Sequence, residues 1–319
     1  MSSAHKDVML QGSTTIPSSG ANDNDVYLKH SGSYYARIVP YPASISDLGL
    51  TGSGIVATIT PDSYTEGLQV ASSKIGYGSS MYDSEIRRVA VTPQATQNWG
   101  IADDGKLKAI IGTMTKPSAV GDIVYKDGSA SPSTLSSISD TQKASAIAVI
   151  FNVSESNIYG VGLKVIKNST KGYKWASSDA VGYNVISTGD DGQDNFTTMS
   201  SLSDWTQRDA KYPAFYMVEN YCQKDPTNLS SGTYKTGWYI PSESEANFLR
   251  PTLYPTVGNV FSTIGTTYAD PLEDAFWTSD QTSGDAYSNY ANYINPKSGA
   301  HGIAKKDSEE YVVRAVRKF

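Results

Sequence analysis

Short apolar runs separated by turn residues dominate residues 26–115. The runs Ile55–Thr60 and Ile86–Thr92 are rich in β-branched side chains, and each stops directly before a proline, as β-strands often do. Similar runs recur roughly every ten residues, which predicts a small all-β, sandwich-like domain. No reactive constellation stands out in it, so we expect a scaffold or attachment role. Residues 1–25 are polar and rich in Ser, Gly and Asn, and we expect them to form a flexible arm.

The pattern becomes mixed over residues 121–319. Two apolar runs, Ala144–Val153 and Tyr159–Ile166, flank a short polar turn and predict a β-hairpin. Apolar residues at helical spacing predict a helix over residues 209–222, and Ser242 with Glu245 forms a capping box that begins another. The chain then returns to strand-like runs, at residues 275–279, 287–294, 302–305 and 311–317. This order of elements predicts an α+β domain.

Three motifs in this part of the chain occur in a recognisable order. Residues Gly237–Leu249 read Gly-Trp-Tyr-Ile-Pro-Ser-Glu-Ser-Glu-Ala-Asn-Phe-Leu, Phe276–Ser279 read Phe-Trp-Thr-Ser, and Tyr311–Arg317 read Tyr-Val-Val-Arg-Ala-Val-Arg. Together they resemble the strand-to-helix signature and the ending of the C-type-lectin-like fold, in its formylglycine-generating-enzyme branch. The resemblance implies an α+β C-type-lectin-like domain for ligand binding over residues 121–319, preceded by the small all-β domain.

The chain departs from the catalytic members of that branch. The resemblance implies that the enzymes of that branch need a pair of active-site cysteines. This chain has a single cysteine, Cys222, on a predicted helix. His301 is the one histidine in the domain and has no evident Ser or Asp partner. Carboxylates are abundant, but no spacing singles out a pair for hydrolysis. We therefore expect a protein that is not an enzyme and has no catalytic residue.

An oxygen-rich segment at residues 189–195 is the one place that suggests a metal. The calcium motifs of sugar-binding C-type lectins, Glu-Pro-Asn, Gln-Pro-Asp and Trp-Asn-Asp, do not occur, and the segment lacks the final Glu of an EF-hand loop. Two interpretations stay open: a solvated turn, and a weak structural site for a cation such as calcium. No other cofactor is expected. The residues concerned are Asp190, Asp191, Asp194 and Asn195.

Composition narrows the function classes further. The net charge is −6 and basic clusters are missing, which argues against nucleic-acid binding. A single Cys excludes an internal disulfide framework, and no apolar run approaches the ~18 residues of a membrane span. The chain has 22 Tyr against 7 Phe, and 15 of those Tyr lie in residues 121–319. Polar-tipped aromatics at this density are typical of adaptable recognition surfaces.

The part of the Tyr excess that points toward function lies in residues 285–295, which interleave Tyr with Asn and contain no Lys, Arg or Glu. The spacing of three between Tyr287, Tyr290 and Tyr293 does not match the period of a strand, so at least one of them should face solvent. A recognition surface and a buried strand face both remain open for this segment. For recognition, the predicted contact residues are Trp277, Asp285, Tyr287, Asn289, Tyr290, Asn292, Tyr293, Asn295 and His301.

The position and composition of this segment resemble the variable proteins diversified by retroelements, in which adenine-rich codons change near the C-terminus of a C-type-lectin-like domain. Every residue from Asp285 to Asn295 belongs to the set that such codons yield. The resemblance implies an adhesin-like protein that recognises a protein or glycan receptor from a cell surface or a phage virion. No signal peptide is visible in this chain. The alternative is an assembly subunit of a tail, fibre or surface polymer, a homo-oligomer that uses the Tyr-rich segment as an intersubunit contact.

Overall fold

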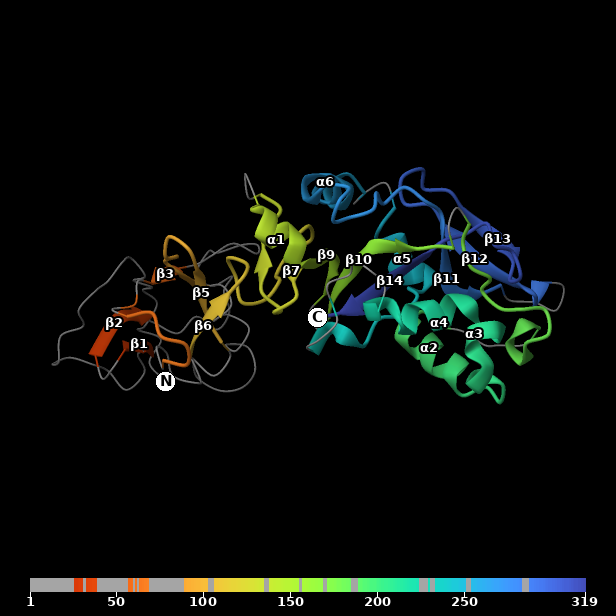
Figure 1. Cartoon of the computed structure of the whole chain (residues 1–319), viewed down its shortest axis with the longest axis horizontal. Helices are drawn as coiled ribbons and strands as arrows, with labels where there is room; N and C mark the ends of the chain where they lie inside the picture. The colour runs from red at the N-terminus through yellow and green to blue at the C-terminus, as the bar shows by residue number, and fades with distance from the viewer. Residues whose placement is uncertain are drawn as a thin grey trace, which may run out of the picture. The chain divides into compact units, whose positions relative to one another are not determined.

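The chain folds into two units, which are described separately. One comprises Met1–Pro117 with Asp127–Ser131, and the other comprises Ser118–Lys126 with Pro132–Phe319. The computed structural model (Figure 1) describes the following residues: 26–30, 33–38, 57–59, 61, 63–68, 89–102, 106–134, 138–154, 157–168, 171–184, 189–223, 229, 233–250, 254–282 and 287–319.

The described part of the first unit consists of short strands, as its sequence predicts. Three strand pairs form: β1 with β2 and β5 with β6 are antiparallel, and β3 with β4 is parallel. Trp99, Ile101, Leu107 and Ile110 are buried around the β5–β6 pair. Since these pairs belong to separate two-stranded sheets in the described residues, the sandwich remains a prediction. The strands are β1 (Val26–His30), β2 (Ser33–Ile38), β3 (Ala57–Ile59), β4 (Val89–Val91), β5 (Asn98–Ile101), β6 (Leu107–Ile110) and β8 (Ala130–Ser131).

An antiparallel sheet forms the centre of the second unit. The predicted hairpin is confirmed, because β9 (Ala146–Val153) pairs with β10 (Ile158–Ile166) across the short turn. The other edge of β9 pairs with β7 (Ile123–Tyr125), and β10 pairs with the last strand, β14 (Val313–Lys318). The order β14-β10-β9-β7 therefore brings the C-terminal strand beside a hairpin about 150 residues earlier in the chain.

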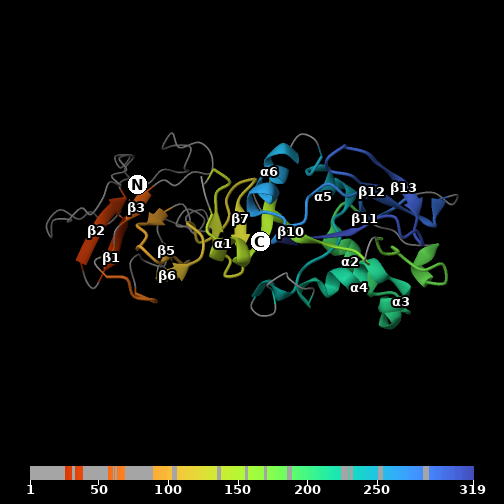
Figure 2. The same cartoon turned by 45° about the horizontal axis from the view of Figure 1, so that its top comes forward.

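A second sheet of three antiparallel strands lies at one end of this unit (Figure 2). It consists of β11 (Phe276–Gln281), β12 (Tyr290–Ile294) and β13 (His301–Lys305) in sequence order. The expected strand at residues 287–294 begins only at Tyr290. Asn295 makes the β12–β13 turn compact, since its side chain accepts from the Ser298 N–H and donates to the Glu273 carbonyl.

The helices of the second unit match the sequence pattern only in part. The capping box is confirmed: the Ser242 hydroxyl accepts from the Glu245 N–H, and the Glu245 carboxylate accepts from the Ser242 N–H. The single helix predicted over residues 209–222 is wrong, because Pro213 has no N–H and starts a new helix. The helices are α1 (Asp140–Ser145), α2 (Gly192–Ser200), α3 (Arg208–Lys211), α4 (Pro213–Glu219), α5 (Glu243–Asn247), α6 (Tyr254–Ile264), and the 3₁₀ turns η3 (Val181–Tyr183), η4 (Trp205–Gln207), η5 (Tyr221–Gln223) and η6 (Thr233–Lys235).

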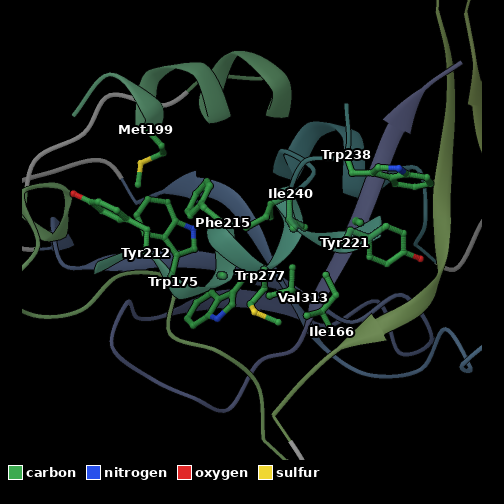
Figure 3. Close-up of a cluster of buried hydrophobic side chains, with 14 of the residues drawn as sticks. Ile166, Trp175, Met199, Tyr212, Phe215, Tyr221, Trp238, Ile240, Trp277 and Val313 are labelled. Atoms are coloured by element: carbon green, nitrogen blue, oxygen red, sulfur yellow. The ribbon is translucent and has the colours of Figure 1, made fainter. Parts of the chain in front are cut away.

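Aromatic side chains fill the core of the second unit (Figure 3). The Trp175 ring meets Phe215 edge-on with ring centroids 4.9 Å apart, and Trp238 packs against Tyr221 at 4.8 Å. Arg314 is also buried. Its guanidinium donates to backbone carbonyls, including those of Leu163 and Asp270. Large anchors of this kind hold a mixed α/β core together.

Lys306 is a second buried cation, and the contacts of its ammonium in the described part of the chain are all with neutral groups. It donates to the carbonyls of Gly182 and Tyr183 and to the Gln281 side chain, at 2.8–3.1 Å, and sits 4.8 Å from the centre of the Trp175 ring. Burial lowers the pKa of Lys306 to about 7. The hydrogen bonds of the Lys306 ammonium therefore connect the end of β13 to η3 and to β11.

The depressed pKa of Lys306 makes stability depend on pH. Between pH 7 and about 10 the unfolded chain binds more protons than the folded chain, so the free energy of unfolding should rise with pH in this window. Chemical denaturation from pH 7 to about 9.5 should show a smaller rise in Lys306→Met than in the wild type. Lys305→Met, which changes the exposed neighbour, is the control and should keep the rise. Equal slopes in all three proteins would contradict the assignment.

Candidate recognition surface on the three-stranded sheet

The strand register divides the Tyr-rich segment between two faces of the sheet. On β12 and β13 the pairs Tyr290–Lys305, Asn292–Ile303 and Ile294–His301 share one side, called here the outer face. The intervening pairs Ala291–Ala304 and Tyr293–Gly302 share the inner face, which packs on the core. Residues that are adjacent in this segment therefore lie on opposite faces of the sheet.

The inner face removes two residues from the predicted contact set. Tyr293 stacks on Tyr311 with ring centroids 4.2 Å apart, and its neighbour Trp277 has no exposed surface. Trp277 packs on Tyr311 at 4.7 Å as well. The prediction that Trp277 contacts a ligand is wrong, because its whole side chain lies in the core. Tyr293 likewise supports the sheet from behind.

Two indole N–H groups tie this inner face to the core in a reciprocal way. The Trp175 indole donates to the Thr278 carbonyl on β11 at 2.9 Å, and the Trp277 indole on β11 donates to the Tyr173 carbonyl at 2.7 Å. Each tryptophan thus satisfies a main-chain carbonyl of the segment that carries the other. Because these bonds are buried, breaking either leaves an unpaired polar group.

A polar network fixes the outer face at α5, the helix begun by the capping box. The Asn292 amide donates to the Glu243 carboxylate at 2.6 Å and accepts from the Thr282 hydroxyl at 3.1 Å. The Asp280 carboxylate accepts from the Glu243 N–H. Asn292 is therefore held in place, and its amide is committed to neighbours within the molecule.

An Arg–His contact borders the outer face at the turn between β12 and β13. Arg250 follows α5, and its guanidinium contacts His301 Nδ1 and donates to the Gly299 carbonyl at 2.7 Å. Because a guanidinium can only donate, Nδ1 is the acceptor of this contact and Nε2 is the ring nitrogen left to meet a partner. The exposed His301 ring thus presents one nitrogen for hydrogen bonding.

Large apolar side chains are exposed around this polar framework. Ile303 on β13 is 42% exposed, and Tyr287, which meets Tyr290 edge-on at 5.7 Å, is 48% exposed. Phe248, at the end of α5, is 47% exposed. The prediction that at least one Tyr faces solvent is confirmed by Tyr287. Exposed large apolar side chains with polar groups near them are common in protein-binding surfaces.

The structure brings part of the predicted contact set together. Tyr287, Tyr290 and His301 lie on or beside the outer face, and Asn292 lies there as part of the supporting network. Asn295 stabilises its turn, the Asn289 carbonyl accepts from the Lys306 N–H, and Asp285 lies outside the described residues. The sequence missed Phe248, Arg250, Ile303 and Lys305. The alternation of Ile303 and Lys305 with small residues in the sequence could have revealed these two. Phe248 and Arg250 reach the surface beside the sheet only in the folded chain.

The oxygen-rich segment has structural roles in the described chain. Asp191 caps α2 by accepting from the N–H groups of Gln193 and Asp194 and pairs with Lys318 at 2.7 Å. The buried Asn195 amide bonds Gly189 and Ser279, and Asp190 accepts from the Ser244 hydroxyl. The segment begins a helix where a turn was one expectation. No group of three His, Cys, Asp or Glu in the described residues is arranged to hold a metal.

The similarity of this chain to known proteins is weak. No protein-family model matches the chain, and no curated protein matches it. Among solved structures, a fimbrial protein from Bacteroides ovatus superposes with a TM-score of 0.46 at 12% identity. That match covers 93% of this chain but only 64% of the fimbrial chain. A likeness at this level carries no argument about function. Within the described residues, no helix is both long and apolar enough to cross a membrane.

The half-buried carboxyl of Asp280 beside α5 gives a test of this geometry. Burial raises the pKa of Asp280 to about 6, the Glu243 N–H opposes the shift, and the nearby Glu243 and Asp190 charges add to it. The folded chain then binds more protons than the unfolded chain between about pH 4 and 6, so this group lowers stability as pH rises through that window.

Asp280→Asn removes this charge but keeps an acceptor for the Glu243 N–H. The variant should melt at a higher temperature than the wild type at pH 7.5, and the difference should vanish below about pH 4, where both side chains are neutral. Scanning calorimetry across pH measures it, with the exposed Asp209→Asn as the control. A wild type that is more stable than Asp280→Asn at pH 7.5 would contradict this arrangement.

Proposed function

We propose that this protein is a non-enzymatic recognition protein displayed on a cell surface or a virion, and that the outer face binds a protein or glycan receptor. The second unit would be a C-type-lectin-like ligand-binding domain, whose sheet and helix α5 present that face. Its mechanism is contact by Tyr287, Tyr290 and Ile303, with hydrogen bonds from His301 and its neighbours selecting the partner. No cofactor is part of this mechanism.

The proposal rests on one observation: large apolar side chains are exposed beside a hydrogen-bonded polar network that holds the outer face in place. Three of the most exposed large apolar side chains in the described chain lie on the sheet or next to it: Ile303 on β13, Tyr287 before β12 and Phe248 directly after α5. Rigid aromatic and β-branched side chains lose little conformational entropy on binding. The network of Asn292 and Glu243 supplies the frame without taking part itself.

A defined panel of purified glycans and extracellular proteins tests this function by biolayer interferometry. Ile303→Asp and Tyr287→Ala should each weaken binding of any recognised panel member by about tenfold or more, because each removes a central contact. Both substitutions change exposed positions, so the fold should survive.

Val153→Asp is the matched control for Ile303→Asp. Val153 is also an exposed β-branched residue on a strand of the second unit, at 38% exposure, but lies on β9. It should bind as the wild type does. The proposal is contradicted if Ile303→Asp and Val153→Asp behave alike, or if no member of the panel binds the wild type.

A further inference from the structure

The outer edge of β13 exposes main-chain hydrogen-bonding groups. The Asn295 N–H donates to the Ala300 carbonyl at 2.7 Å, and the Lys306 N–H donates to the Asn289 carbonyl at 2.9 Å. The register between these two bonds is regular and antiparallel. Since bonded pairs alternate in such a ladder, Gly302 and Ala304 also bond toward β12. The backbone groups of the intervening residues, 301, 303 and 305, point away from the sheet.

Nothing in the described part of the chain pairs with that edge, because the sheet order ends at β13. One outward group is used locally, since the Lys305 carbonyl accepts from the Ser308 N–H at 2.9 Å. The N–H and carbonyl groups of His301 and Ile303 and the N–H of Lys305 remain. The strand has neither a proline nor a bulge, and an unprotected edge of this kind is a template for another strand.

The side chains along β13 indicate which strand would fit. His301, Ile303 and Lys305 are exposed in alternation and all lie on the outer face. A second copy paired antiparallel about Ile303 would place the Lys305 ammonium opposite the His301 ring, which offers it no carboxylate. A strand with acidic residues opposite these two positions and a β-branched residue opposite Ile303 would instead be complementary.

The protein's own acidic residues near the strand do not occupy this place. After the turn at residues 306–308, the Glu309 carbonyl accepts from the Gly172 N–H at 2.8 Å, and the Tyr311 carbonyl accepts from the Tyr173 N–H. These bonds draw the chain back to the core. Glu309 and Glu310 therefore follow the strand without lying along its edge.

We propose that β13 accepts an extended, acidic segment of a partner protein as a fourth, antiparallel strand. Main-chain bonds to His301, Ile303 and Lys305 supply the attachment, and the alternating side chains on the outer face supply the selectivity. This rests on the proposed function and specifies it, because it names a protein segment as the partner and strand addition as the mode of binding.

The probe is an end-blocked peptide, Thr-Glu-Thr-Val-Thr-Glu-Thr, titrated into the ¹⁵N-labelled full chain. Binding should shift the amide resonances of His301, Ile303 and Lys305 and slow their hydrogen exchange by about tenfold or more. The same peptide N-methylated at Val loses the central donor and should bind at least about tenfold more weakly. A peptide with Lys in place of Glu should bind more weakly still at low salt.

Two substitutions at one position separate backbone from side chain. Ile303→Pro removes the outward N–H and should abolish peptide binding, whereas Ile303→Val keeps that N–H and should bind within about threefold of the wild type. Protection of the β12 amides in Ile303→Pro checks that the sheet still forms.

Absence of any added protection at the amides of His301, Ile303 and Lys305 in millimolar peptide would overturn strand addition. Equal binding of the N-methylated peptide would overturn it too, and equal binding of the Lys peptide would overturn the acidic partner. If a member of the glycan and protein panel still depends on the Ile303 side chain while the peptide fails, recognition by the outer face stands and only the strand-addition mode falls.

Discussion

The reciprocal pair of tryptophan hydrogen bonds is the interaction on which the rest of the candidate surface depends. Trp175 and Trp277 each bury a large ring in the core while donating to a carbonyl beside the other. A three-stranded sheet with one solvated face has little area of its own to stabilise it. These buried anchors, with Lys306 at the end of β13, join the sheet to the aromatic core and hold its outer face in one position.

That constraint explains how one short, polar segment can serve two purposes. The two-residue period of β12 sends Tyr293 inward to Tyr311 and leaves Tyr290 and Asn292 on the outer face. The inward residues fix the sheet, and on the outer face Ile294 is buried and Asn292 is held by Glu243 and Thr282. Exposure increases toward β13, where side chains and backbone groups are both accessible. The exposed side chains of β13 are therefore the ones that can vary in sequence while the fold stays constant.

Sequence alone predicted the parts of this arrangement that depend on local chemistry. The β9–β10 hairpin and the Ser242 capping box came from short-range patterns, and both are confirmed. The helical spacing over residues 209–222 is local too, but the chain starts a new helix at Pro213, which has no N–H to continue the one before it. Trp277 was misassigned because burial depends on residues a hundred positions away. Arg250 was missed for the same reason, since only the fold brings it to His301.

Native-state hydrogen exchange by NMR is the most direct test of a preformed outer face that is held in place by contacts on the inner face of the sheet. The account predicts that the indole N–H groups of Trp175 and Trp277 and the ladder amides of β11 and β12 exchange only through global unfolding. Their opening free energies should then agree within about 1 kcal/mol with those of β9 and β10. A three-stranded sheet that opens several kcal/mol below the β9–β10 hairpin, with the hairpin still protected, would contradict a fixed recognition face.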